Sequence, residues 1–281
     1  MTCCAGDFQR AGPTAPPNPS PGAAIVIASA PNLRDLGGWA TARGGHLRYG
    51  QVYRSTELSR LHNADLAAFE ALNIRTVFDL RTMAEVRGQP DALPPGVRTV
   101  HLDVLADSST LTLASLHAVL EDPPMVAELL GDGRVAEVMA GAYRDIIELP
   151  GARAAYQQLF SELADPDLGP ALFHCTAGKD RTGWAAAALL TLLGVDSDTV
   201  MHEYLLTNEE LLPALKPLLD EFAERGGDPN LLVPLLGVQP TYLQTALDQI
   251  GAEFGSIEAY FTDGLGLEPT TLDALRAKLV E

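Results

Sequence analysis

Hydrophobic and polar positions follow two different periods along the chain, and their order predicts an α/β protein. Short apolar or alternating runs, which are typical of buried strands, occupy residues 47–55, 74–80, 97–105 and 171–174. Apolar residues at helical spacing predict helices over residues 64–72, 110–149, 150–163, 184–193, 198–206, 208–222, 242–261 and 270–281. Because strands and helices alternate, we expect a central, mostly parallel sheet flanked by helices on both faces.

The first residues differ from the rest of the chain in composition. Residues 1–22 contain five prolines among small and polar neighbours, which predicts a disordered N-terminal tail. Residues 23–281 are numerous enough to bury a substantial core, and we expect them to form a single domain.

Charge and composition narrow the range of partners. The 37 acidic and 19 basic residues give a formal net charge of −18, which argues against nucleic-acid binding and against attachment to anionic membranes. The sequence contains no secretory signal and no apolar run of the roughly 18 residues that stable membrane insertion needs. Three cysteines do not make a disulfide framework or a zinc site. We therefore expect a cytoplasmic protein.

The most informative stretch is Ala171–Gly183, ALFHCTAGKDRTG, which ends a predicted strand and opens a predicted helix. A loop at a helix N-terminus directs several backbone N–H groups at one point, and the helix dipole adds positive charge there, so that phosphate can bind. The same surroundings favour the thiolate of Cys175, the form in which cysteine is a nucleophile. Arg181 can hold two phosphoryl oxygens bidentately, which a lysine cannot do.

Other residues of this loop suit the same chemistry. Gly178 lets the backbone come close to a ligand, and Thr182 can place a hydroxyl beside the sulfur. An inert core cysteine is the alternative, but the polar neighbours of Cys175 do not suit a dry core. A nucleotide-binding P-loop is excluded because Asp180 follows Lys179 where Ser or Thr is required. The predicted phosphate donors are the backbone N–H groups of Thr176, Ala177, Gly178, Lys179, Asp180 and Arg181.

The spacing of Cys175, five further residues and Arg181-Thr182, with His174 in front, resembles the signature of the cysteine-based protein tyrosine phosphatases. More narrowly, HCTAGKDRTG is similar to the loop of the atypical bacterial tyrosine and lipid phosphatases related to the mycobacterial protein tyrosine phosphatase B. In that family Lys and Asp stand at the positions of Lys179 and Asp180. Further similar segments are Arg34–Gly38, Asp79–Thr82, Leu236–Leu243 and Gly255–Phe261.

The resemblance implies a protein tyrosine phosphatase fold and a phosphatase that needs no metal and no cofactor. Its substrates would be phosphorylated proteins, on tyrosine and also on serine or threonine, or phosphoinositides, cleaved through a cysteinyl-phosphate intermediate. Lys179 would receive a second phosphate or an acidic flank of the substrate. The family also covers its active site with a helical lid, which would fall at about residues 205–240 here. Core packing or a dimer surface would give the same amphipathic pattern.

Four carboxylates are candidates for the general acid. Asp180 is the first choice, because it lies inside the loop and matches the family's unusual aspartate. Asp79 is the second, because it ends a predicted strand at the sheet edge where ligands gather. Asp103 and Asp107 lie in a loop that supplies the acid in many phosphatases of the superfamily. Ion pairing or ordinary loop polarity would explain the last three equally well.

An acidic protein that binds phosphorylated substrates needs a local basic funnel, and six basic side chains are candidates for it: Arg34, Arg54, Arg60, Arg81, Lys179 and Arg181. Arg34, Asp35, Arg54 and Glu57 are candidates for facing the substrate. For Asp35 and Glu57 the alternative is a buried ion-pair set that braces the sheet. The alternative function is a non-catalytic phosphate-recognition module, which would share the phosphate loop and lack a working acid. Sulfur transfer or arsenate reduction would require a second nearby cysteine.

Overall fold

The computed structural model describes residues 19–108 and 122–281, and its centre is a five-stranded sheet. The strand order is β1-β2-β5-β3-β4, in which β1 runs antiparallel to β2 and the other three pairings are parallel. The predicted mostly parallel sheet is therefore confirmed. The strands are β1 (Arg34–Asp35), β2 (Val52–Ser55), β3 (Thr76–Asp79), β4 (Arg98–His101) and β5 (Ala171–His174).

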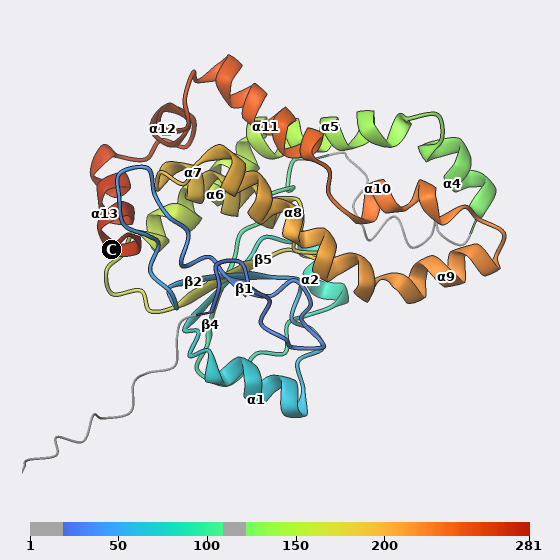
Figure 1. Ribbon diagram of the computed structural model, residues 1–281, viewed down its shortest axis with the longest axis horizontal. Coiled ribbons are helices and arrows are strands. Elements are labelled where there is room, and N and C mark those ends of the chain that lie inside the picture. Colours follow the sequence, from blue (N-terminus) through green and yellow to red (C-terminus); the bar gives the residue numbers. More distant parts are fainter. Residues whose placement is uncertain (1–18, 109–121) are drawn as a thin grey trace, which may run out of the picture.

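Helices cover both faces of this sheet, with α1 on one face and most of the others on the opposite face (Figure 1). The helices are α1 (Asn63–Ala71), α2 (Met83–Gly88), α4 (Pro123–Leu130), α5 (Arg134–Glu148), α6 (Pro150–Leu163), α7 (Arg181–Leu192), α8 (Ser197–Ala214), α9 (Lys216–Glu224), α10 (Val233–Leu236), α11 (Pro240–Glu253), α12 (Ile257–Ala259) and α13 (Pro269–Leu279). Two short turns complete them, the 3₁₀-helical η1 (Pro229–Leu231) and the π-helical η2 (Tyr260–Gly264).

Alternation along the strands divides the core into two parts. Tyr53, Val77 and Leu172 point to the face covered by α1, where they pack with Phe69. Their apolar neighbours on the same strands point to the other face and join the larger cluster that includes the alanine-rich helix α7: Val52, Phe78, Ala171 and Phe173. Because successive side chains of a strand point to opposite faces, each central strand contributes to both clusters.

The carboxyl ends of the strands lie in register. His174 of β5 stands opposite Ser55 of β2 and Asp79 of β3, and Asp79 in turn stands opposite His101 of β4. The loop that follows β5 therefore emerges at the edge of the sheet where β2 and β3 also end. This edge is the usual place for ligands in an open α/β sheet.

Three predicted helix boundaries are wrong, and each has a local cause. The predicted stretch 110–149 is interrupted between α4 and α5, where Asp132 and Gly133 both have a left-handed φ. The expected separation near residue 207 does not exist, because α8 runs unbroken to Ala214 and the chain bends at Leu215. Pro217 has no N–H to donate to the carbonyl of Pro213, which ends the first helix there. The predicted helix 242–261 ends at Glu253, because Gly255 has a left-handed φ of 80°.

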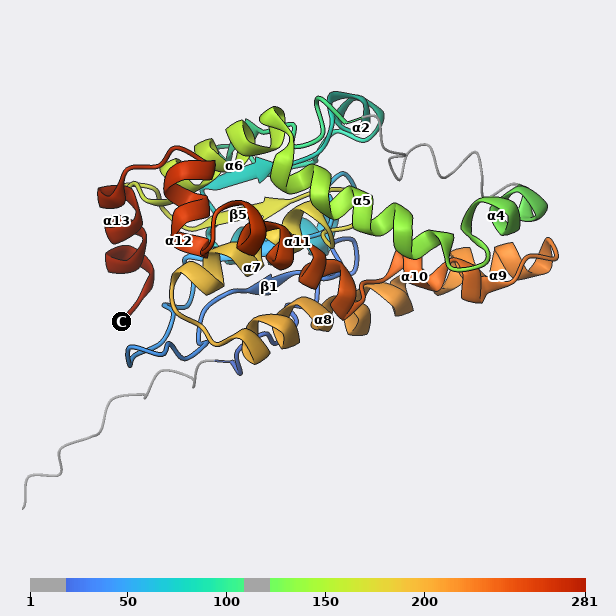
Figure 2. The same ribbon diagram turned by 90° about the horizontal axis from the view of Figure 1, so that it is seen from above.

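Helices α4, α9 and α10 extend beyond the sheet as a projection on the right of both views (Figures 1 and 2). None of the helices in residues 19–108 and 122–281 is long and apolar enough to cross a membrane. The predicted tail lies outside the described residues up to residue 18, as do residues 109–121 of the predicted helical stretch 110–149.

Candidate active site

Residues from other parts of the chain hold the loop between β5 and α7, Cys175–Asp180, by donating hydrogen bonds to its carbonyl groups. Arg54 Nη2 and Asn32 Nδ2 donate to the carbonyl oxygen of Gly178 over 2.7 and 3.0 Å. The backbone N–H of Glu57 donates to the carbonyl of Thr176 over 3.1 Å. Within the described part of the chain, the backbone N–H groups of residues 176–180 have no hydrogen-bond acceptor. The loop therefore offers a row of unpaired donors, which is the arrangement that binds an anion.

Gly178 is required by the geometry of this loop. Its φ is 63°, in the left-handed region, and a Cβ atom added there would lie 2.2 Å from the carbonyl oxygen of Ser55. Only glycine fits such a position without moving the backbone.

Cys175 and Arg181 lie at the two ends of the loop. Cys175 is a free cysteine at the end of β5, and its side chain is almost completely covered. The Arg181 guanidinium donates through Nη1 to Leu80 O and Glu85 Oε2 over 3.2 and 2.8 Å, and through Nη2 to Glu85 Oε1 over 2.9 Å. Of its five N–H groups, Nε–H and one Nη2–H remain without an acceptor among the described residues. These two donors lie on one edge, the geometry that holds two phosphoryl oxygens.

Glu85 fixes the guanidinium in this orientation. It is the third residue of α2, where it completes a capping box with Thr82, and its Oε1 also accepts from the Thr176 hydroxyl. Burial alone would raise the pKa of Glu85, but its bonds with Arg181 and Thr176 lower it to about 2. Burial would likewise lower the pKa of Arg181, but Cys175 and Glu85 raise it instead. Both partners are therefore charged at neutral pH.

Lys179 and Asp180 form an ion pair within the loop. The Lys179 ammonium lies 2.7 Å from both carboxylate oxygens of Asp180, and Oδ1 of Asp180 also lies 3.0 Å from the hydroxyl of Tyr143. Lys179 is buried, whereas the side chain of Asp180 is 24% exposed. Of the four candidate acids, Asp180 is the one that belongs to the loop.

Asp79 belongs to a buried ion-pair cluster beside the loop. Both of its oxygens accept from the Arg81 guanidinium, over 2.9 and 2.7 Å, and Arg81 also binds Asp91. The ring N–H at Nε2 of His174 donates to Asp91 over 3.0 Å. Burial would lower the pKa of His174, but Asp91 and Asp79 raise it. Asp79, Asp91 and His174 have the spacing of a metal-ligand group. Arg81 already supplies the counter-charge for the two carboxylates.

The remaining candidates lie in several places. Asp103 accepts from the backbone of Met83 and Leu105, and Asp107 accepts from the backbone N–H of Gly151 at the start of α6. These contacts are typical of acids that cap turns and helices. The Thr182 hydroxyl is buried at the start of α7 and has no partner among the described residues.

The expected basic funnel is smaller than the sequence suggests. Arg34 and Arg54 are completely buried and both bind Glu203 of α8, at 2.7 and 2.8 Å. Asp35 accepts from the backbone of Gly37 and Gly50, so it braces a turn. Arg60 remains as an exposed cation at the cavity described next.

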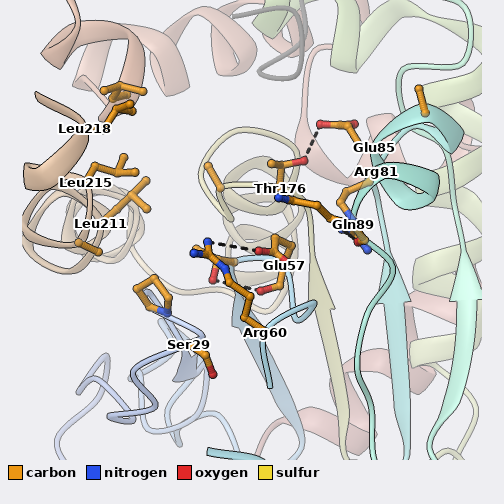
Figure 3. A pocket seen from close by; sticks show the side chains of 17 residues that line it. Ser29, Glu57, Arg60, Arg81, Glu85, Gln89, Thr176, Leu211, Leu215 and Leu218 are labelled. Atoms are coloured by element: carbon orange, nitrogen blue, oxygen red, sulfur yellow. Dashed lines mark hydrogen bonds and ion pairs between the residues drawn. The ribbon is translucent and has the colours of Figure 1, made fainter. Parts of the chain in front are cut away.

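A cavity of about 410 Å³ opens beside the loop, with one polar and one apolar side. Thr176 and Ala177 of the loop line the polar side, together with Glu57, Arg60 and Glu85 (Figure 3). On the other side, leucine side chains from α8, from α9 and from the turn between them point into the same space (Figure 3). We call this apolar side the leucine wall, and it consists of Leu211, Leu215, Leu218 and Leu236.

Sequence reasoning missed Glu85, Asp91, Tyr143 and Glu203, which complete the surroundings of the loop. The Thr82-Met-Ala-Glu85 stretch carries the signature of a capping box and could have indicated the start of α2. No signal in the sequence connects the other three residues with the loop.

Comparison with known proteins agrees with this site. The model of the tyrosine phosphatase family matches residues 25–281. The chain is 32% identical to the triple specificity protein phosphatase PtpB of Mycobacterium tuberculosis over 275 residues, which cover 89% of this chain and 96% of that protein.

It is also 32% identical over 247 residues to a protein of Cupriavidus necator that is provisionally named a tyrosine-protein phosphatase, with 86% and 84% of the two chains covered. A tyrosine-protein phosphatase of Nostoc commune matches 62% of the chain at 32% identity. The resemblance of the loop is thus confirmed over nearly the whole sequence, and the chain is a phosphatase that belongs to the tyrosine phosphatase family.

Proposed function

We propose that the protein hydrolyses phosphomonoesters through a covalent cysteinyl phosphate. The Cys175 sulfur attacks phosphorus, and the ester P–O bond breaks while the leaving oxygen takes up a proton. Water then attacks phosphorus, the S–P bond breaks, and inorganic phosphate and the free thiolate are released. The observation that carries this proposal is the orientation of Arg181. Glu85 and Leu80 occupy one side of the guanidinium, and an edge with two donors remains beside the unpaired amides of the loop.

The backbone N–H groups of residues 176–180 and the free edge of Arg181 bind the equatorial oxygens of the phosphoryl group. These donors are in place before the substrate binds, so they need not reorganise as charge develops in the transition state. His174 supports the start of the loop through its bond with Asp91, and the Thr182 hydroxyl, which has no partner among the described residues, is available to the sulfur.

Asp180 is the first choice for the acid that protonates the leaving group. In the free enzyme its carboxylate pairs with Lys179. A phosphate dianion in the loop would attract the Lys179 ammonium, and this would leave Oδ2 of Asp180 available to the leaving oxygen. In the second step the same carboxylate activates water. Asp79 is the second choice, because Arg81 holds both of its oxygens and keeps it in the cluster.

Phosphotyrosine is the principal substrate that we propose, and phosphoserine, phosphothreonine and phosphoinositide head groups are further ones. The leucine wall suits an aromatic ring, and Lys179 and Arg60 suit a second phosphate or an acidic flank. Rates of phosphate release from a phosphotyrosine peptide, a phosphoserine peptide and a soluble phosphoinositide, measured side by side, rank these substrates.

The deciding experiment is Cys175→Ser. We expect turnover of p-nitrophenyl phosphate to disappear while the affinity for inorganic phosphate, measured by calorimetry, stays within about twofold, because the loop amides and Arg181 are retained. Unchanged turnover would end the proposal.

A non-catalytic phosphate-recognition module would share the loop and Arg181. Membership of an enzyme family and the presence of Cys175 and Asp180 in one loop weigh against this alternative. Sustained phosphate release from a phosphotyrosine peptide, over many turnovers per protein molecule, separates the two.

A further inference from the structure

Two buried tyrosines meet behind the loop, and we propose that they position the carboxyl group of Asp180 for proton transfer. Tyr143 of α5 and Tyr204 of α8 have no exposed surface, and their hydroxyl oxygens lie 2.5 Å apart. The Tyr143 hydroxyl also lies 3.0 Å from Oδ1 of Asp180. This inference rests on the proposed role of Asp180 as general acid.

The chemistry of the groups fixes the direction of both hydrogen bonds. A tyrosine hydroxyl has one proton to donate. Oδ1 of Asp180 accepts both when the carboxyl is ionised and when Oδ2 carries the proton, so Tyr143 donates to Asp180. Tyr143 must then accept from Tyr204. Burial, with the charge of Asp180 and the neighbouring Tyr204, raises the pKa of Tyr143 well above its ordinary value, so this donor keeps its proton.

This chain of donors leaves only one oxygen of Asp180 for chemistry. With Oδ1 occupied by Tyr143, a proton taken up by Asp180 sits on Oδ2. Lys179 contacts both oxygens in the free enzyme. Once a bound phosphate attracts Lys179, the Tyr143 hydroxyl is the contact that keeps the carboxyl group from rotating. Tyr143 is therefore a positioning residue, and Tyr204 supports it.

Other charged and titratable groups near Asp180 stay in place when a tyrosine hydroxyl is removed, so they do not confuse the test. They are Lys179 and Arg181 of the loop and its helix, Tyr156 of α6 and Tyr242 of α11.

Tyr204 also ties this contact to the cavity. Its sequence neighbour Glu203 binds Arg54, which donates to the carbonyl of Gly178, so two adjacent residues of α8 are linked to the loop, through Arg54 and through Tyr143. Two turns further on, the same helix contributes Leu211 to the leucine wall. The same helix thus carries both the support of the acid and part of the substrate cavity.

The test compares Tyr143→Phe, Tyr204→Phe, Asp180→Asn and Tyr143→Phe/Asp180→Asn on aryl phosphates whose leaving phenols differ in pKa. For Tyr143→Phe we expect kcat on phenyl phosphate, a poor leaving group, to fall about fivefold to tenfold, and kcat on p-nitrophenyl phosphate to fall less than about twofold. KM should not change. Tyr204→Phe should act in the same direction and more weakly. The double variant should match Asp180→Asn, because no acid is left to position.

The dependence of kcat on the pKa of the leaving phenol gives a readout that a purely structural role would not move. This dependence should become steeper in Tyr143→Phe, because a misplaced acid matters most for the leaving groups that most need a proton. Tyr260→Phe is the matched control, because its buried hydroxyl contacts only Trp184 among the described side chains and it should leave kcat and its leaving-group dependence unchanged.

Each contrary result has its own meaning. If Asp180→Asn slows poor leaving groups selectively and both tyrosine variants behave like the wild type or lose activity equally on all substrates, the positioning role is overturned and the proposed function stands. If Asp180→Asn shows no leaving-group dependence, the acid assignment fails and the positioning role fails with it. Should Tyr143→Phe unfold in a thermal melt, Tyr204→Phe decides by the same criteria.

Discussion

The phosphate loop and the leucine wall face each other across one cavity, but different forces hold them. Side chains from β2, from α2 and from Asn32, which lies just before β1, hold the loop through hydrogen bonds and ion pairs, most of them buried. The leucine wall comes from α8, α9, the turn between them and α10, with η1 between α9 and α10. Leu215, Leu218 and Leu236 hold their place by apolar packing. Around the leucine wall, polar support comes from Asn208, which pairs with the backbone of Val238, and from Tyr242, which binds Pro234 O.

This difference separates two tasks. Transition-state stabilisation requires donors that do not move, and directional bonds supply that rigidity to the loop. Admission of substrates requires a surface that can adapt, and apolar contacts tolerate small shifts because they are not directional. We propose that residues 205–240 act as a lid, and we expect damage to the loop to lower kcat strongly and damage to the leucine wall to change KM modestly.

Among substitutions in the loop and its helix, we expect the largest loss of activity from Arg181→Lys. A lysine ammonium cannot bind Glu85 and two phosphoryl oxygens at once, because it lacks the planar set of donors. We expect kcat on p-nitrophenyl phosphate to fall about 10³-fold, with the thermal midpoint lowered by several degrees. Arg225→Lys is the control, since Arg225 is exposed and binds Glu221 on the same helical turn. A loss below tenfold for Arg181→Lys would contradict the bidentate assignment.

The second largest loss of activity should come from Gly178→Ala. The added methyl group would collide with the carbonyl of Ser55 and would have to occupy a left-handed conformation, so the loop amides must shift. We expect kcat/KM to fall about 10²-fold. Gly251→Ala in α11 is the matched control, because a Cβ atom there meets open space and alanine favours the helix. Equal activity of the two variants would show that the loop is not held as tightly as its contacts suggest.

The loop was easier to predict from the sequence than the residues that surround it. The loop was predictable because Cys175, Asp180 and Arg181 lie within seven consecutive residues between a recognisable strand and helix. The partner of Arg181 could not be predicted, because Glu85 lies 96 positions away and only the fold brings it next to the guanidinium. Tyr143 and Tyr204 are likewise 61 positions apart and look like ordinary apolar helix positions. The leucine pattern was visible, but the bend at Leu215 depends on which proline interrupts the helix.

The buried pair of Glu85 and Arg181 should make the stability of the protein depend on pH. The pKa of Glu85 falls from 4.5 to about 2 in the folded protein, so its carboxylate stabilises the fold above pH 4.5 and this contribution is lost as the pH falls towards 2. The free energy of unfolding of Glu85→Gln should therefore be about 3 kcal/mol lower than that of the wild type at pH 6 to 7. Urea denaturation measures this difference as a lower midpoint concentration.

The gap between the two proteins should narrow between pH 4.5 and pH 2, since the wild type loses the same interaction there. The other buried acids titrate in both proteins and cancel in the difference. Glu70→Gln, at an exposed position of α1, should follow the wild type at every pH. A gap that stayed constant from pH 7 to pH 2 would exclude the Glu85–Arg181 pair as its source.

The smallest effect should come from the leucine wall. Leu218 and Leu219 are neighbours on α9 and both are half-buried, but only Leu218 lines the cavity. Leu218→Ser should raise KM for a phosphotyrosine peptide about threefold to tenfold, because part of an apolar contact with the substrate is lost, and leave kcat within about twofold. Leu219→Ser removes a similar area without touching the cavity, so its KM should stay at the wild-type value. If both variants lowered kcat and left KM unchanged, the leucine wall would act on the chemical step through the fold rather than on substrate binding.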